Sequence, residues 1–131
     1  MKVDRKKGVI LIENFSEIKG NIDFDGSIFV GIGCKLEDLK GKELFIGKGS
    51  SFRNAIAERI VLGAFSTFKR IEANSVILMN GCKGKEIFGK FVKIGERCEI
   101  NEIRAISLEL SGNSKVVKIS VEKLRCLSHF K

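Results

Sequence analysis

The chain repeats itself every sixteen residues. Starting at Leu44, apolar, glycine and small residues occupy fixed positions, and similar residues return at those positions in the stretches that begin at Ile60, Val76 and Val92. A fixed period of this length is the sequence signature of a solenoid, in which each repeat is one structural unit stacked on the next. From residue 27 the register continues without insertion through six repeats: 27–42, 43–58, 59–74, 75–90, 91–106 and 107–122.

Aliphatic positions within a repeat lie two residues apart, as Ile60 and Leu62 do. That spacing places both side chains on one face of a β-strand. Four such columns are almost wholly apolar from repeat to repeat, and their many β-branched residues disfavour a helix. The columns are Ile28, Leu44, Ile60, Val76, Val92 and Leu108; Val30, Ile46, Leu62, Leu78, Ile94 and Leu110; Leu36, Phe52, Phe68, Gly84, Ile100 and Val116; and Leu39, Ala55, Ile71, Ile87, Ile103 and Ile119.

The repeat therefore predicts an all-β fold, a single-stranded parallel β-helix (β-solenoid) of about six 16-residue coils that stack about 4.8 Å apart. Left-handed β-helices are built from six-residue motifs, and sixteen is not a multiple of six, which argues against that class. Glycine follows most of the strands, and we expect the corners there to require its freedom in φ. These glycines are Gly31, Gly47, Gly63 and Gly95.

Both ends of the chain depart from the repeat. Residues 1–8 are a short basic arm, and the coil that follows is degenerate, with Ile12 in phase with Ile28. We predict a β-helix domain over residues 9–122, because atypical terminal repeats are expected in solenoids, where they cap the stack. Residues 123–131 fit either a partial last coil or a short capping helix, since the residues match both periods.

Most of the net charge of +8 lies at the two ends. The arm carries Lys2, Arg5, Lys6 and Lys7, and residues 115–131 carry five cations against one acid. A nucleic-acid reader usually spreads its basic residues along the body of the domain, so this distribution argues against one. Two interpretations of the arm stay open, a disordered terminus and a contact of its four cations with an anionic membrane or polyanion.

Catalysis and metal binding find little support. Cys34, Cys82 and Cys98 share one position with serines and are interpreted as small packing residues; a disulfide between the last two stays open but is disfavoured. The lone His129 cannot supply a metal site. We therefore expect no enzyme, no metal and no cofactor. A column of mixed charge is interpreted as a solvated face: Glu37, Arg53, Lys69, Lys85 and Asn101.

No apolar run near the start of the chain is long enough for a membrane helix or for the core of a signal peptide. The longest run there is Val9 to Ile12. We therefore expect a cytoplasmic protein that associates with a membrane, if at all, through its basic ends.

The sequence resembles the bactofilins, the polymer-forming cytoskeletal family. Three stretches carry the resemblance, IKGNIDFDGSIFVG, LFIGKGSSFRNAIAERIVLG and VILMNGCKGKEIFGKFVKIG, within a shared coil pattern over roughly residues 12–119. The resemblance implies a compact right-handed β-helix that polymerises without nucleotide. Subunits of the family join end to end through terminal coils into non-polar filaments, which serve as a scaffold for cell shape or organisation. Met79 departs from the family's pattern, which has glycine at that corner.

Open β-helix ends favour assembly on physical grounds too, because unpaired strand edges associate with other chains unless they are capped. We expect the partner to be a second copy of the chain, joined through apolar residues of the terminal coils. The expected N-terminal contact involves Ile12, Phe15, Ile22 and Phe24, and the expected C-terminal contact involves Leu124, Leu127 and Phe130.

One column of outward-facing residues is apolar, although its side chains are expected to face solvent. Between the two inward aliphatic positions it reads Phe29, Phe45, Val61 and Ile77 before it becomes charged. The β-propensity of a sheet surface would explain these residues, but we favour cover by a terminus or a partner. This stripe supports the alternative function, a β-helical binding module that does not polymerise and docks a protein partner, as a division-site regulator would.

Overall fold

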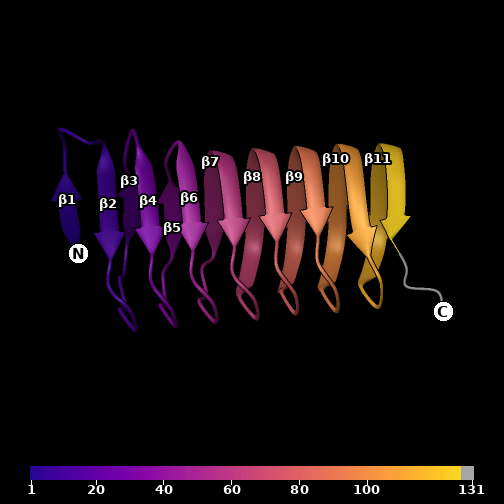
Figure 1. Cartoon of the computed structure of the whole chain (residues 1–131), viewed down its shortest axis with the longest axis horizontal. Helices are drawn as coiled ribbons and strands as arrows, with labels where there is room; N and C mark the ends of the chain where they lie inside the picture. The colour runs from indigo at the N-terminus through magenta and orange to yellow at the C-terminus, as the bar shows by residue number, and fades with distance from the viewer. Residues whose placement is uncertain (128–131) are drawn as a thin grey trace.

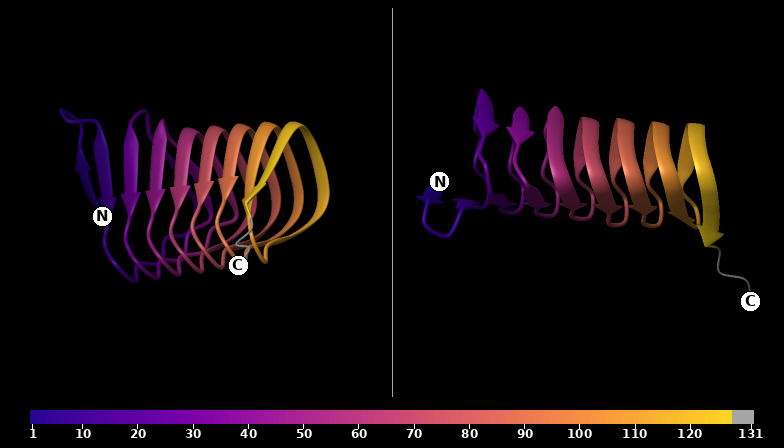
Figure 2. Two further views of the ribbon diagram at one scale, coloured as in Figure 1. Left: turned by 45° about the vertical axis from the view of Figure 1, so that its right-hand side comes forward. Right: turned by 90° about the horizontal axis from the view of Figure 1, so that it is seen from above.

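The computed structural model describes residues 1–127 and shows a right-handed β-solenoid of about seven turns (Figure 1). Apart from the first strand, the strands at the front of Figure 1 run in one direction, the chain returns behind them, and each turn advances along the long axis. The two terminal strands lie at opposite ends of the stack (Figure 2). The predicted all-β fold class is therefore confirmed.

Three sides make up each coil, and eleven strands lie on them within the described residues. The first side carries β2, β4 and β6, the second carries single bridges in the early coils, and the third carries β3 and β5. From β8 onward, one bent strand follows all three sides. The strands are β1 (Lys2–Asp4), β2 (Val9–Ile12), β3 (Asn21–Asp23), β4 (Ser27–Val30), β5 (Asp38–Lys40), β6 (Glu43–Ile46), β7 (Asn54–Leu62), β8 (Thr67–Leu78), β9 (Lys83–Ile94), β10 (Glu99–Ser111) and β11 (Lys115–Leu127).

Neighbouring coils pair in parallel at a constant offset of sixteen residues from β4 onward. Ile28 pairs with Leu44, Leu44 pairs with Ile60, and the column continues to Leu108 at β10. All six side chains of this column are buried. The predicted columns therefore form one continuous apolar core, in which like residues stack on like.

The first coil is two residues longer than the others, and the predicted register was wrong there. Ile12 pairs with Val30, not with Ile28. The offset between the first two coils falls from eighteen residues in β2 to seventeen in β3, and it reaches sixteen from β4 onward. One extra residue therefore lies between β2 and β3, and another lies between β3 and β4.

The corner after the first side is turned by a residue in the left-handed conformation. This residue lies two positions beyond the glycines that were predicted to need φ freedom, so that prediction was wrong. A Cβ on Gly47 would instead lie 2.5 Å from the carbonyl oxygen of Gly31 in the preceding coil, which excludes side chains by close stacking. The residues with positive φ at this corner are Phe15, Gly33, Gly49, Phe65, Gly81, Arg97 and Asn113.

The basic arm is folded, which excludes the interpretation as a disordered terminus. β1 pairs antiparallel with β2, with Val3 opposite Ile10, and residues 5–8 form the turn between them. At the other end, β11 extends the coil pattern to Leu127, where Leu124 pairs with Leu108. Residues 123–127 therefore belong to a further partial coil and not to a helix.

Gly81→Ala is expected to lower the free energy of unfolding by about 2 kcal/mol or more. The φ of Gly81 is 74°, which costs alanine about 1–2 kcal/mol, and its Cβ would lie 2.5 Å from Cδ1 of Phe65. Gly49→Ala is the control, because its φ is 69° but nothing lies within 4 Å of the added Cβ. Urea denaturation measures both.

In a Phe65→Ala background, the loss of unfolding free energy caused by Gly81→Ala should fall to that caused by Gly49→Ala. The new Cβ then meets no ring that it would have to displace. An unchanged cost would show that the ring of Phe65 does not constrain the glycine beneath it.

Candidate functional site

The C-terminal coil leaves the core open. Leu108 is fully buried, whereas Leu124, which pairs with it in the same column, is 51% exposed. Ile103 is fully buried and its partner Ile119 is 38% exposed. Within residues 1–127, β11 pairs only with β10, so the outer edge of this 13-residue strand has unpaired backbone groups. Such an edge is a template for pairing with another chain.

Two of the three residues predicted for the C-terminal contact lie within the described part of the chain. Leu124 lies in the open column just described, and Leu127 ends the open strand. Phe130 lies outside the described residues, as does His129. The structure therefore places the described part of this predicted contact at one end of the solenoid.

The N-terminal end is partly closed. β1 covers the edge of β2, and within the described residues β3 pairs only with β5, so the third side keeps an open edge. Of the residues predicted for this contact, Ile12 is buried in the core, and Ile22 and Phe24 are half-buried on the third side. Phe15 is 77% exposed at the corner after β2. The four residues do not share one surface, because β2 and β3 lie on different sides of the coil (Figure 1).

The apolar stripe is longer than predicted. Leu11 pairs with Phe29, so the stripe begins in the first coil, where the two extra residues hid its register. Leu11 and Phe29 are exposed and the next three members, Phe45, Val61 and Ile77, are half-buried. The rings of Phe29 and Phe45 stack with their centroids 4.9 Å apart. β1 lies beside β2 within the sheet, so this terminus does not cover the stripe.

The four cations of the arm stay together at the N-terminal end. Lys2 lies in β1 opposite Leu11, and Arg5, Lys6 and Lys7 lie in the turn that follows. All four residues are exposed, and the backbone N–H of Lys7 donates to the Asp4 carboxylate at 3.1 Å. The arm is thus a charged edge strand and turn.

The column that holds three of the cysteines is also a hydrogen-bond ladder. Ser50 Oγ donates to the carbonyl oxygen of Gly31 at 3.0 Å, and Cys82 Sγ donates to that of Gly63 at 3.2 Å. Each acceptor lies at the corner of the preceding coil. Packing alone does not explain the column, and the ability of both Ser and Cys to donate was the overlooked signal. The equivalent bond is made by Cys34, Ser66, Cys98 and Ser114.

All four cysteines are free thiols, so the disulfide that the sequence left open is not formed. Cys34, Cys82 and Cys98 are buried, and Cys126 is exposed. The pKa of Cys82 is raised by its interaction with the neighbouring thiol of Cys98 and by burial. Within residues 1–127, no three side chains of a kind that ligates metals come together.

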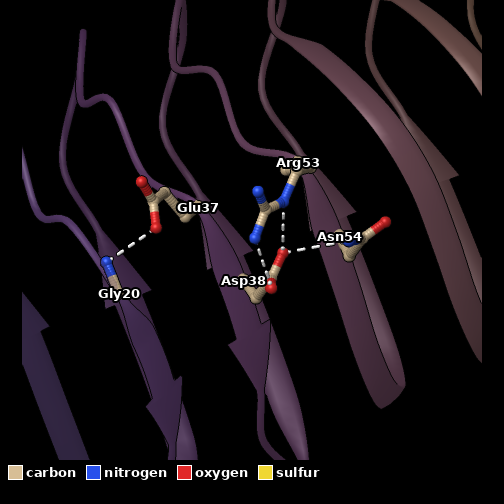
Figure 3. A network of polar contacts seen from close by, with 5 residues as sticks. All are labelled: Gly20, Glu37, Asp38, Arg53 and Asn54. Atoms are coloured by element: carbon tan, nitrogen blue, oxygen red, sulfur yellow. Dashed lines mark hydrogen bonds and ion pairs between the residues drawn. The ribbon is translucent and has the colours of Figure 1, made fainter.

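A polar network ties the second and third coils together on the third side (Figure 3). Arg53 donates from Nε and Nη2 to the two carboxylate oxygens of Asp38 at 3.1 and 2.8 Å, and Asn54 donates to the same carboxylate at 3.0 Å. The hydrogen bonds from Arg53 hold the pKa of Asp38 below its ordinary value. Glu37 accepts the backbone N–H of Gly20 at 2.8 Å. Both acids are therefore occupied by partners within the chain.

Comparisons with known proteins return no match to a family model, to a curated protein or to a solved structure. In the part of the chain that the structure describes, no helix is long and apolar enough to cross a membrane. The functional argument therefore rests on the surfaces described above.

A single thiol is expected to react in the folded protein. Cys126 is exposed, whereas the other three thiols are buried in the ladder, where the reagent cannot reach them without local opening of the fold. Titration with Ellman's reagent should therefore count one fast thiol per chain under native conditions and four in guanidinium chloride. Cys126→Ser should remove the fast reaction, and a second fast thiol in that variant would contradict the buried ladder.

Proposed function

We propose that the protein is a structural, cytoskeletal protein that self-assembles end to end through its terminal coils without nucleotide. The resemblance to the bactofilins implies this function. The observation that carries it is the open edge of β11, where Leu124 and Ile119 are exposed although the residues that they pair with in β10 are fully buried. Covering that end with an equivalent end would bury both residues and pair the backbone groups of the strand.

Differences between the two ends favour a non-polar arrangement. A head-to-tail contact would bring β11 against the first coil of the next subunit, where β1 already occupies the edge of β2. Two C-terminal coils related by a twofold axis would instead pair β11 with β11 antiparallel, with no strand in the way. The filament would then alternate this contact with one between N-terminal ends.

Charge opposes the contact between C-terminal ends. β11 carries Lys115, Lys118, Lys123 and Arg125 against Glu122, and twofold pairing doubles this excess of positive charge. At 0.1 M ionic strength, salt largely screens the repulsion between exposed charges that are more than about 10 Å apart. Assembly through this end should therefore be promoted by moderate salt.

Leu124→Glu is expected to lower the pelleted fraction several-fold in ultracentrifugation without nucleotide, because the new carboxylate would be buried in the contact. Val117→Glu is the matched control. It makes a similar substitution on the same strand, but Val117 is 82% exposed on the outward face. Circular dichroism should show both variants folded. A wild-type chain that stays monomeric across salt and concentration, or equal pelleting of the two variants, would contradict end-to-end assembly.

The apolar stripe supports a second candidate function, a binding module that docks a protein partner and does not polymerise. Five apolar residues in successive coils, from Leu11 to Ile77, keep part of their surface in water on one side of the sheet. A row of this kind marks an interaction surface more often than chance exposure does.

Phe45→Asp tests whether the stripe is a contact between subunits. End-to-end assembly predicts unchanged pelleting, with a free energy of unfolding lowered by about 1 kcal/mol through loss of the stacked ring. Loss of pelleting in Phe45→Asp, with normal pelleting in Leu124→Glu, would place the contact between subunits on the stripe and not at the ends.

A further inference from the structure

A row of cations runs along the second side of the solenoid. Arg53, Lys69 and Lys85 occupy the same outward position in three successive coils, and the backbone N–H of Lys69 donates to the carbonyl of Arg53. Coils are spaced about 4.8 Å apart, so the three cations form a line parallel to the solenoid axis. Beside this line a second outward column contributes Ser51, Thr67 and Lys83. We call these six residues the basic row.

Neighbouring acids do not neutralise the middle of the basic row. Asp38 is held by Arg53 and Asn54, and Glu99 lies 3.5 Å from Lys83. Within residues 1–127, neither Lys69 nor Lys85 has a carboxylate within ion-pair distance. Elsewhere on the surface, charges of opposite sign pair between adjacent coils, as Lys93 and Glu109 do at 3.9 Å. A run of like charge in adjacent coils is self-repelling, and an external anion would relieve that repulsion.

The basic row borders a shallow depression of about 360 Å³. Its floor is formed by Phe52 and Phe68, whose buried rings stack with centroids 5.8 Å apart. Ser51 and Thr67 place hydroxyl groups beside the cations at the rim of this depression. Hydroxyl and cationic donors in combination are the groups that hold phosphate oxygens in protein–nucleic acid complexes.

We propose that the basic row binds a linear phosphate-bearing polymer, such as a single-stranded nucleic acid, along the solenoid axis. Cations in a line match a chain of phosphates better than a flat lipid surface does. The basic row also has no exposed large apolar side chain that would insert into a bilayer. It has no exposed aromatic ring on which a base would stack, so the polymer is held by its backbone and without sequence preference.

The distribution of charge along the sequence does not predict this surface. The sequence concentrates basic residues at its two ends, and the column of the basic row reads there as mixed charge on a solvated face. Folding brings Lys69 and Lys85 into adjacent coils, while Asp38 pairs with Arg53 at one end of the row and Glu37 accepts a hydrogen bond from Gly20. The inference goes beyond filament assembly and does not depend on it.

Fluorescence anisotropy with a labelled oligothymidylate tests the proposal over a series of NaCl concentrations. The double variant Lys69→Ala/Lys85→Ala should weaken binding about tenfold and should reduce the salt slope by about 1.4, since each contact with a single strand contributes about 0.7. The control Lys40→Ala/Lys90→Ala removes the same charge from exposed positions outside the basic row and should leave the affinity within about twofold. Inorganic polyphosphate should compete with the oligonucleotide.

Equal weakening by the two double variants would overturn the proposal, because binding would then follow net charge alone. Vesicles that contain phosphatidylglycerol form the second arm. Binding to vesicles that depends on Lys69 and Lys85, without binding to oligothymidylate, would also overturn it and assign the row to a membrane surface. Both arms are repeated in the Leu124→Glu background, so that loss of filament assembly and loss of polymer binding are measured separately.

Discussion

Backbone pairing between successive coils is the interaction on which the rest of the structure depends. From β4 to β11, each coil pairs with its neighbours at a constant sixteen-residue register, which stacks like residues on like. This register makes the core column from Ile28 to Leu108 continuous and dry. Stacking completes every inner coil but neither terminal one. The pairing that builds the core therefore leaves β11 with an open edge, and the proposed assembly follows from that edge.

The sixteen-residue period predicted the middle of the fold because each apolar column there contains six residues at the same spacing. The first coil was misaligned because its two extra residues shift its sides by different amounts. Ile12 is offset by eighteen residues from its partner and Ile22 by seventeen, so no single period aligns this coil with the next. β1 was missed for another reason. Three residues that pair antiparallel with β2 leave no periodic signal, and pairing with the first coil is what orders them.

Surfaces were less predictable than the core, because they depend on which residues become neighbours. Phe15 and Phe65 take the left-handed corner that glycine takes in other coils, and no composition rule predicts an aromatic residue there. The Ser and Cys ladder was visible as a column of small residues, but its hydrogen bonds require the corner carbonyls of the preceding coil. The spacing of Lys69 and Lys85 was equally visible. The sequence did not show that Asp38 pairs with Arg53 and that Glu37 accepts a hydrogen bond from Gly20. Within the part of the chain that the structure describes, these contacts leave Lys69 and Lys85 without a carboxylate partner.

Fibre diffraction from aligned assemblies of the wild-type protein, grown without nucleotide, tests the central claim most directly. If coils continue to stack across subunit contacts, the spacing of about 4.8 Å between coils lies along the filament axis and gives a meridional reflection. Assembly through the apolar stripe would turn the solenoids across the filament and move that reflection to the equator. An equatorial reflection, or no ordered assemblies at any protein or salt concentration, would contradict end-to-end stacking.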